Sequence, residues 1–594
     1  MASTLPRLPI FEAIASHDPK STVVVHSASG RRFTYGELLS DVAERKDSLL
    51  KESGRSGIEG ERIAFLVENS YDYVVTLLSI LGTHSIALPL SPAFPPHELQ
   101  YIMDQSQALM LLSSSKFENQ ALDVYKEGLQ GTPRHVKLEK KLGGRKHEQV
   151  KLDGPTQGAG GMMLYTSGTT NRPKGVLLPT AAMTAQANSL IAAWDYRPTD
   201  YLLHVLPLHH IHGTINAIFA PLFAGSTIEF LFPFNATAVW NRFAAPFLPP
   251  TNGHTNGHTQ TNGSSLTNGH TAPSPITFFT VVPTVYNRLL ATFPTLPSIV
   301  QTAAQEAISP SHLRLNISGS AALPTPTKKA WETLSNGNVL LERYGMTEVG
   351  MALSCGLPFS TRVDGSVGWP LPGVEARLFE TETQSLILPG EELDKNGRER
   401  DGEIQLRGPG LFQEYWGNET ATKKEHVQGE DGKGRWFRTG DVAVRRFVPG
   451  VSDRESGNGE EWCKGPLYFI HGRLSSDIIK SGGEKVSALE VERELLSLPQ
   501  VLECAVVAVP SGNWGQKVGC VIVLRDPITG GRKEGMWGPL DMRRALKGRL
   551  AGYKIPQVMK VVPSIERNAM GKVNKKVLVK KVFVDEMSGD EKDL

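Results

Sequence analysis

The sequence predicts an α/β protein with a large N-terminal part built on largely parallel sheets and a small α+β part at its C-terminal end. In the first part, short β-rich runs such as Arg62–Val67, Ala108–Leu112 and Leu202–Leu206 alternate with helical patterns. Such alternation is typical of parallel sheets whose strands are joined by helices. The length of 594 residues also favours more than one domain.

The pattern changes near residue 472, where the small C-terminal part begins. A helical pattern at Leu489–Leu498 is followed by strand patterns at Cys504–Val509 and Val518–Leu524 and by a second helical pattern at Leu540–Leu550. Together these elements span about 110 residues, the size of a small independent domain. The sequence then ends in an acidic tail, which we expect to be frayed.

The segment Thr251–Pro275 differs from its surroundings because it contains the tetrapeptide TNGH three times. The histidines of these repeats allow a metal site as one interpretation. With only Leu266 and Ala272 as apolar residues, however, the segment cannot bury a core. We therefore predict a disordered surface insertion over residues 251–275 that has no part in the chemistry.

The charge balance argues against a nucleic-acid partner, because 63 basic residues face 61 acidic ones and leave a formal net charge of +2. The four cysteines lack metal-ligand spacing, and so few in a long chain favour a reducing compartment. No apolar run reaches the roughly 18 residues of a membrane span. The nearest, Tyr73–Leu90, is interrupted by Gly82, His84 and Pro89 and predicts a buried helix followed by a strand.

Targeting signals are weak at both ends of the sequence. The first residues lack the apolar stretch of a secretory signal, and a single Arg and a single Glu keep a mitochondrial presequence open. The last residues, Lys592–Leu594, do not form the peroxisomal Ser-Lys-Leu ending. We expect a cytoplasmic protein, with a mitochondrial one as the alternative.

The strongest local signal is Tyr165–Val176, which reads YTSGTTNRPKGV and follows an apolar strand pattern. Its serine, threonine and glycine residues present hydroxyl and backbone N–H groups around a concavity, and a lysine adds a point charge. The spacing differs from the Walker pattern, since Lys174 comes six residues after Gly168 with no Ser or Thr behind it. An ordinary polar loop is the alternative interpretation. We predict a phosphate-binding loop that uses Thr166, Ser167, Gly168, Thr169, Thr170 and Lys174.

This loop resembles that of the adenylate-forming superfamily of acyl-CoA synthetases, luciferases and peptide-synthetase adenylation domains, in which it holds the ATP phosphates. Further motifs follow in the order of that family over nearly the whole chain: Glu342–Glu348 (ERYGMTE), Trp436–Asp441 (WFRTGD), His471–Lys480 (HGRLSSDIIK) and Asn568–Asn574 (NAMGKVN). The resemblance implies a large N-terminal domain of several subdomains and a small, mobile α+β C-terminal domain. It places the domains at residues 1–471 and 477–582, a hinge at 472–476 and the acidic tail at 583–594.

The resemblance also implies roles for individual residues of these motifs. Tyr344 belongs to the segment that stacks on adenine, and Thr347 and Glu348 would face the phosphates and Mg²⁺, with Glu348 as the metal ligand. Asp441 would bind the ribose hydroxyls, and Arg473 would lie near the ribose. The cofactors implied are therefore ATP, Mg²⁺ and, as the second substrate, coenzyme A.

The motif NAMGKVN resembles the loop that delivers the catalytic lysine, here Lys572. Attack of a carboxylate on the α-phosphorus of ATP brings two anions together, so a lysine and Mg²⁺ at the developing charge lower the barrier. Gly571 would let the backbone enter a crowded site. The alternative is that Lys572, Lys575 and Lys576 form a solvated basic run.

The family performs a second half-reaction, thioester formation, after rotation of the small domain. Ser475 stands where the family usually has Lys or Asp as the pivot, which leaves the rate of this rotation open. The glycine-rich turn with Ser481, Gly482 and Gly483 would line the entry of the thiol. Because no carrier-protein domain is expected after Lys581, a free thiol such as coenzyme A is the expected acceptor. Oligomeric state stays open.

Pro207–Gly213 (PLHHIHG) resembles the acid-binding wall of the family, with His210 at the usual aromatic or histidine position. We assign His210 and His212 to the substrate site, His210 also as a catalytic residue, although a polar packing cluster is the alternative. The segment around Ser318, Gly319 and Ser320 supplies small residues and hydroxyls to the neighbouring wall.

Arg288 lies in a helical pattern that starts at Pro283. Val281, Val285 and Leu289 repeat at helical spacing, and Arg288 is seven residues from Val281, which predicts a place at the edge of the buried face. In relatives that take fatty or aromatic acids, this segment lines the acyl pocket and is mostly apolar. The resemblance therefore implies that a cation here pairs with a second negative charge on the substrate. An arginine whose charge reaches solvent is the alternative.

Glu342–Leu353 and Lys480–Glu490 look particularly like the malonyl-CoA synthetase subgroup, in which an Arg holds the distal carboxylate. The resemblance implies the reaction of malonate, ATP and CoA to malonyl-CoA, AMP and pyrophosphate. Methylmalonate is a further candidate, because one methyl group changes binding by only about 1–3 kcal/mol. The alternatives are an acyl-CoA synthetase for a short or medium monocarboxylic acid, a luciferase-like oxidase and a non-catalytic adenylate-binding regulator.

Overall fold

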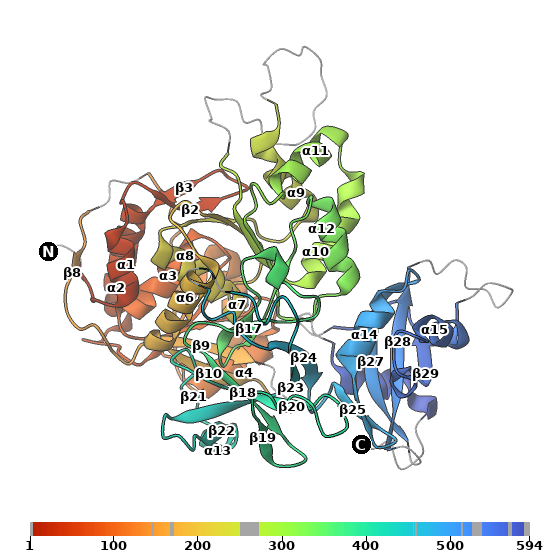
Figure 1. The fold of residues 1–594 in the computed structure, drawn as a ribbon. Coiled ribbons are helices and arrows are strands. Elements are labelled where there is room, and N and C mark those ends of the chain that lie inside the picture. Colours follow the sequence, from red (N-terminus) through yellow and green to blue (C-terminus); the bar gives the residue numbers. More distant parts are fainter. Residues whose placement is uncertain are drawn as a thin grey trace.

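The computed structural model describes residues 4–144, 148–166, 172–249, 273–455, 457, 460–511, 515–525, 537–567 and 573–586. Within these residues, the N-terminal part contains three large sheets and the C-terminal part a fourth (Figure 1). Nearly all of the predicted insertion at Thr251–Pro275 lies outside the described residues.

The largest sheet has nine strands, of which the six in the middle run parallel to their neighbours and the edge strands run antiparallel. In spatial order the strands are β17 (Trp369–Pro370), β16 (Gly350–Ser354), β15 (Leu341–Met346), β14 (Leu315–Ser318), β13 (Phe278–Val281), β11 (Tyr201–His204), β12 (Thr227–Phe230), β2 (Thr22–His26) and β3 (Arg32–Thr34).

The second sheet has seven strands, of which five are parallel and two at one edge are antiparallel. In spatial order they are β21 (Glu414–Tyr415), β10 (Lys174–Pro179), β9 (Gly161–Thr166), β5 (Ile86–Pro89), β4 (Arg62–Leu66), β6 (Met110–Ser114) and β7 (Arg134–Leu138). A separate pair is formed by β1 (Thr4–Leu5) and β8 (Lys151–Leu152). The prediction of an α/β fold with largely parallel sheets is confirmed for both large sheets.

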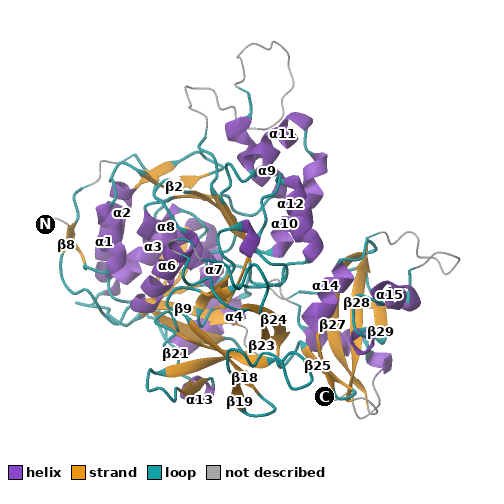
Figure 2. Cartoon of the chain, viewed as in Figure 1, coloured by secondary structure: helices purple, strands orange, loops and turns teal. Residues whose placement is uncertain are grey.

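Helices cover both faces of these two sheets, which explains why their strands are apolar on both sides. Between the sheets pack α1 (Pro9–Ser16), α2 (Tyr35–Ser53), α3 (Tyr71–Gly82), α6 (Thr180–Trp194) and α8 (Ala220–Ala224). The outer face of the nine-stranded sheet carries α9 (Ala236–Ala244), α10 (Pro283–Thr292), α11 (Ser298–Ala307) and α12 (Thr325–Leu334), which lie together in Figure 2. The outer face of the seven-stranded sheet carries α4 (Pro96–Ser106) and α5 (Glu118–Lys126).

Helix α3 lies at the centre of this arrangement, and every one of its residues is buried. It is followed by β5, so the prediction of a buried helix and a strand for Tyr73–Leu90 is confirmed. No helix within the described ranges is both long and apolar enough to cross a membrane.

The third sheet is antiparallel and connects the large sheets to the C-terminal part. Its strands are β19 (Ser385–Ile387), β18 (Glu375–Glu380), β20 (Gly402–Arg407), β23 (Arg435–Arg446), β22 (His426–Gln428) and β24 (Leu467–Arg473), with α13 (Glu419–Lys424) beside them. Strand β24 pairs with β23 and leads directly into the predicted hinge.

The C-terminal part has a sheet and two hydrophobic clusters of its own, which explains why it forms a separate lobe in Figure 1. The strands are β26 (Glu484–Ser487), β25 (Ile478–Ser481), β28 (Gly515–Leu524), β27 (Val501–Ser511) and β29 (Val558–Val561). One cluster contains α14 (Ala488–Leu496) and α15 (Pro539–Leu546), and the other contains α16 (Lys575–Val582). The small α+β domain is confirmed, whereas the limits of the hinge stay a prediction.

Candidate active site

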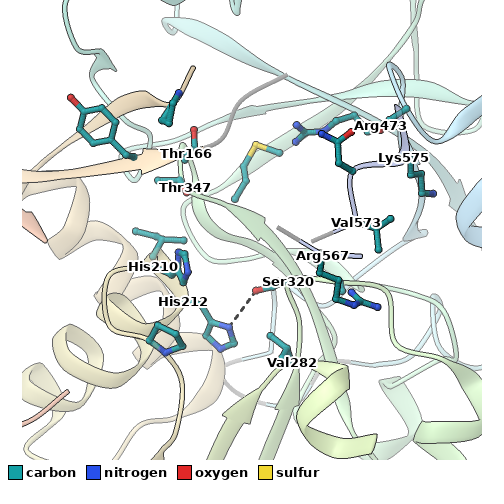
Figure 3. Close-up of a pocket in the computed structure, with 18 of the residues that line it drawn as sticks. Thr166, His210, His212, Val282, Ser320, Thr347, Arg473, Arg567, Val573 and Lys575 are labelled. Carbon is teal, nitrogen blue, oxygen red and sulfur yellow. Dashed lines mark hydrogen bonds between the residues drawn. The ribbon is translucent and has the colours of Figure 1, made fainter. Parts of the chain in front are cut away.

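A cleft with a volume of about 2710 Å³ lies where the carboxyl ends of the parallel strands of the nine-stranded sheet meet the C-terminal domain (Figure 3). The ends of parallel strands are the usual ligand site of open α/β sheets, because the loops of several strands meet there. Of the residues predicted from the sequence, those that line the cleft are Thr166, His210, His212, Ser318, Ser320, Tyr344, Thr347, Glu348, Asp441 and Arg473.

The predicted ribose site is a compact group of three side chains. Asp441 on β23 and Arg473 on β24 are direct cross-strand partners, and Arg473 Nε donates to Asp441 Oδ1 over 3.2 Å. Tyr344 at the end of β15 donates its hydroxyl to Asp441 Oδ2 over 2.6 Å. Burial and the neighbouring Asp441 raise the pKa of Tyr344 well above its usual value, so this phenol remains a donor. The carboxylate of Asp441 is thereby fixed in direction toward the cleft.

The two ends of the predicted phosphate loop lie side by side, because Thr166 on β9 pairs with Lys174 on β10. Lys174 is not among the cleft-lining residues; its Nζ lies over the ring of Tyr415, 5.0 Å from the ring centroid. Tyr415 in turn donates its hydroxyl to Glu348 Oε1 over 2.9 Å. Tyr415 therefore links the lysine of the loop to the predicted metal ligand. The sequence did not single out Tyr415.

Five predicted residues lie outside the described ranges, so the structure does not test their roles. They are Ser167, Gly168, Thr169, Thr170 and Lys572. Their assignments stay predictions.

His212 forms the floor of the predicted acid pocket and is buried. Its Nε2 is 2.8 Å from Thr280 Oγ1 and its Nδ1 is 3.3 Å from Ser320 Oγ, so both ring nitrogens are engaged (Figure 3). Burial and, to a lesser extent, Arg343 lower the pKa of His212 well below its usual value, so the ring is neutral. His210 lies at the cleft wall, and its ring centroid is 4.5 Å from that of His209.

Ser320 adopts a left-handed backbone conformation, with a φ of 66°. This conformation is uncommon for a residue with a side chain and is typical of functional sites. This conformation places Ser320 Oγ between His212 and Arg343. Arg343 Nη2 donates a hydrogen bond to Ser320 Oγ over 3.3 Å.

Arg343 is a buried cation in the wall of the cleft, with 4% of its surface exposed. Its Nε has no hydrogen-bond partner, and within the described part of the chain no carboxylate forms an ion pair with it. The side chain lies against the backbone at Gly319, where a Cβ atom would come within 2.4 Å of Nε. Burial lowers the pKa of Arg343 to about 10, so the group is still charged near neutral pH.

Arg343 was not assigned a role from the sequence, although it stands inside the motif ERYGMTE. The signal available was a charged residue in a strand of a sheet that is covered on both faces. Such a residue is costly unless it is paired or serves a ligand. Gly319 was predicted as a substrate-site residue, and the structure gives it a steric role beneath this guanidinium.

Arg288 has a different position from the one expected at the edge of the buried face. It is exposed on α10, it does not line the cleft, and its guanidinium carbon lies 4.9 Å from the centroid of the Phe234 ring. The helical count from Val281 fails because that residue belongs to β13, and the helix begins only at Pro283. The buried face of α10 is formed by Pro283, Val285, Tyr286 and Leu289.

The predicted thiol-entry turn joins β25 and β26, with Gly482 and Gly483 in left-handed conformations. Ser481, Gly482 and Gly483 do not line the cleft. Beside them, Lys485 forms ion pairs of 3.0 Å with Asp401 and 3.1 Å with Glu382 of the N-terminal domain. The C-terminal domain faces the cleft instead with Arg567, Val573 and Lys575 (Figure 3).

The structure has two domains, and residues predicted to bind a nucleotide and an acid line one cleft. The family described as AMP-binding enzyme matches residues 11–416, and the family described as AMP-binding enzyme C-terminal domain matches residues 490–572. The chain belongs to the adenylate-forming superfamily of AMP-binding enzymes and, within it, to the acid–CoA ligases. The class predicted from the sequence is thereby confirmed.

Three relatives match over almost the whole chain. A CoA ligase from Gibberella moniliformis is 54% identical over 98% of this chain and 96% of its own length. The human mitochondrial malonate–CoA ligase is 34% identical over 96% of this chain and 92% of its own length. The malonate–CoA ligase from Arabidopsis thaliana is 34% identical over 96% of this chain and 88% of its own length.

Solved structures match over similar lengths. ATP-bound MatB from Rhodopseudomonas palustris has a TM-score of 0.73 at 27% identity and covers 98% of this chain and 99% of its own. The o-succinylbenzoate CoA synthetase from Bacillus subtilis has a TM-score of 0.69 at 23% identity, covers 96% of this chain and 98% of its own, and supports the fold alone.

Proposed function

We propose that this acid–CoA ligase activates malonate and forms malonyl-CoA. The observation that carries the proposal is Arg343, a buried cation without a carboxylate partner among the described residues, at the wall of the acid pocket. A dicarboxylic acid supplies the missing anion with its second carboxylate, whereas a monocarboxylic acid leaves the cation unpaired. The names of the human and Arabidopsis relatives support the same substrate.

In the first half-reaction, a carboxylate oxygen of the acid attacks the α-phosphorus of ATP, and the bond to pyrophosphate breaks. We assign the phosphates to the loop between Thr166 and Lys174, and the ribose to Asp441 with Arg473. The lysine of the C-terminal domain, Lys572, would approach the developing charge and lower the barrier. In the second half-reaction, the thiol of CoA attacks the acyl carbonyl, AMP leaves with the mixed-anhydride oxygen, and the thiol proton is lost.

Glu348 would hold a Mg²⁺ ion that enters with ATP. Its carboxylate lies at the cleft wall, oriented by Tyr415, which fits the one or two carboxylates that Mg²⁺ takes beside phosphate oxygens. A group of three or more His, Cys, Asp or Glu able to hold a resident ion is absent from the described residues, in keeping with an ion that arrives on the nucleotide. When bound, Mg²⁺ offsets negative charge on the phosphates.

In the acid pocket, we assign the distal carboxylate to Arg343 and Ser320, with the neutral His212 beneath and His210 at the wall. The reacting carboxylate would then point toward Thr347 and the phosphates. Methylmalonate fits the same polar contacts with one methyl group more. Arg288, which is exposed and does not line the cleft, stays a proposed second cation.

The test is acid-dependent release of pyrophosphate by the purified protein, with malonate, methylmalonate, succinate and butyrate, each with and without CoA. We expect malonate to have the highest kcat/KM, and malonyl-CoA to form only when CoA is present. Equal turnover of butyrate and malonate would refute the dicarboxylate assignment. Absence of release with every acid would favour a non-catalytic adenylate-binding regulator, and oxygen uptake would indicate an oxidase.

The cytoplasmic location stays a prediction, and the names of the human and mouse relatives state a mitochondrial one. Fractionation of cells that express a tagged chain would decide between the two compartments. A mature mass shorter at the N-terminus would identify a cleaved presequence.

A further inference from the structure

Lys575 is the first residue of α16 and follows Lys572 by three positions. Its side chain is only 13% exposed, and its Nζ lies 2.5 Å from Asp477 Oδ1 and 2.8 Å from Glu492 Oε1. Its neighbour Lys576 is exposed. The basic run after Lys572 is therefore not uniformly solvated, because one of its members is held between two carboxylates.

Each carboxylate of this triad of Lys575, Asp477 and Glu492 also holds backbone. Asp477 Oδ2 accepts from the N–H of Arg473 over 3.0 Å, at the start of the turn that follows β24. Glu492 on α14 accepts from the N–H of Val506 on β27 over 2.8 Å. One ammonium group thus connects the predicted hinge, the central sheet of the C-terminal domain and the start of α16.

The packing around the triad leaves the Asp477 side chain little room to move. A Cβ atom at Gly472 would come within 2.5 Å of the Asp477 Cβ, so the hinge backbone lies directly against this side chain. Burial opposes the charge of Lys575, but the two carboxylates raise its pKa above the usual value. Removing the cation would leave two half-buried anions, with 16% and 17% of their side chains exposed, close together, which is unfavourable.

Lys575 is connected to the proposed catalytic residue Lys572 by only a short length of chain. Three residues of extended chain span at most about 11 Å, so a fixed Lys575 limits where Lys572 can be presented. Arg567, Val573 and Lys575 line the cleft on this side (Figure 3).

We propose that Lys575 is a positioning residue for adenylation, which fixes the loop with Lys572 to the hinge side of the C-terminal domain. The inference rests on the proposed role of Lys572. Lys575 acts through that lysine and does not itself touch the substrate. Loss of the triad would remove the attachment of Lys575, and displacement of a reacting group by about 1 Å can cost on the order of 10²-fold in rate.

The test compares Lys575→Met, Lys575→Arg and Lys581→Met in the two half-reactions. Lys581 is the matched control, because it lies on the same helix and pairs with the exposed Glu566. Adenylation is measured as acid-dependent exchange of pyrophosphate into ATP, and thioester formation is measured with supplied acyl-adenylate and CoA. The acid is the one that the wild-type protein turns over best.

For Lys575→Met, we expect the kcat of exchange to fall by about 10- to 100-fold, with KM for ATP within about twofold. Thioester formation should fall by less than about threefold, so the two half-reactions separate. Lys575→Arg should keep most of the exchange activity, and Lys581→Met should behave as wild type in both assays. Unchanged exchange in Lys575→Met, or equal loss in both half-reactions, would overturn the proposal.

A double variant tests whether Lys575→Met lowers activity only because it destabilises the fold. Glu492→Gln with Lys575→Met removes one buried anion together with the cation, so the net charge of the triad stays the same. We expect it to recover the Tm lost in Lys575→Met without recovering exchange. Recovery of exchange together with Tm would show that the triad acts on stability alone. Failure of the malonate proposal is distinguishable, because another acid would then support exchange in the wild-type protein.

Discussion

The two sides of the cleft each contain a cation with little exposure, Arg343 at 4% and Lys575 with 13% of its side chain exposed, and the two differ in their partners. Arg343, on the N-terminal side, has one long hydrogen bond to Ser320 and no carboxylate partner among the described residues. Lys575, on the C-terminal side, lies between Asp477 and Glu492. A buried charge without a partner costs several kcal/mol, so a fold retains it only where something else brings the opposite charge.

This difference in partners indicates the role of each cation. The charge of Lys575 is paired with two carboxylates of the protein, and these carboxylates in turn accept hydrogen bonds from the backbone of Arg473 and Val506. The charge of Arg343 is left for a ligand that supplies an anion. The surroundings agree with this difference, because the loops at Arg343 begin at the ends of buried parallel strands, whereas Lys575 pairs with Asp477, next to the predicted hinge.

The largest effect is expected from Lys572→Ala, because Lys572 is the group that the C-terminal side would present to the reacting phosphate. We expect acid-dependent pyrophosphate exchange to fall by about 10²–10³-fold. Thioester formation from supplied malonyl-adenylate should be affected much less, since we expect that step to follow a rotation of the C-terminal domain. Single-turnover assays of both steps measure this. An equal loss in both steps would contradict the division of labour between the two conformations.

The next effect is expected from Arg343→Met, which keeps the volume of the side chain and removes the charge. Loss of one member of a buried ion pair costs about 3–5 kcal/mol, and the cleft is open to solvent, so we expect about a 10²-fold loss in kcat/KM for malonate. The kcat/KM for butyrate should stay the same or rise. Steady-state kinetics with both acids measure the change in preference. A parallel loss for both acids would indicate a damaged pocket, and an unchanged preference would remove Arg343 from the acid site.

The two cations also show how much of the fold and the site could be predicted from the sequence. The motifs and their order were sufficient for the fold class, the two domains and the cleft residues Tyr344, Asp441 and Arg473. Strand positions were close but shifted, as with Ala108–Leu112 against β6 at Met110–Ser114. The pairing of Asp441 with Arg473 was not predictable, because it depends on the register between two strands whose separation in the sequence is 32 residues.

The burial of side chains explains the remaining differences between the sequence-based predictions and the structure. Arg343 and Lys575 both stood in quoted segments, yet whether a charged side chain is buried depends on the packing of distant elements. Arg288 was expected at the edge of the buried face, and its side chain is exposed. A helix start at Pro283 was itself predicted correctly, but counted along that helix Arg288 lies about 60° from Val285 and about 160° from Tyr286, so the count alone could not decide whether the side chain is buried.

A smaller effect is expected from Gly319→Ala, which tests whether the position of Arg343 matters as well as its charge. The new methyl group would come within 2.4 Å of Arg343 Nε and 2.6 Å of its Cζ, so the guanidinium must shift. We expect about a tenfold loss in kcat/KM for malonate and little change for butyrate. Gly57→Ala is the control, because nothing lies within 4 Å of a Cβ atom there. A change below about twofold would mean that the arginine can relocate without loss.

The smallest effect is expected from Arg288→Ala, and its salt dependence should separate the two arginines. Arg288 is exposed over Phe234, so it would act on the arriving dianion through solvent, where one charge contributes only about 1 kcal/mol. We expect up to about a fivefold loss in kcat/KM for malonate at low ionic strength. At about 0.5 M salt most of this loss should disappear, because screening acts on exposed charges, whereas the effect of Arg343→Met should persist. A salt-independent loss in Arg288→Ala would instead place this guanidinium against the bound acid, and α10 would then have to rearrange when the substrate binds.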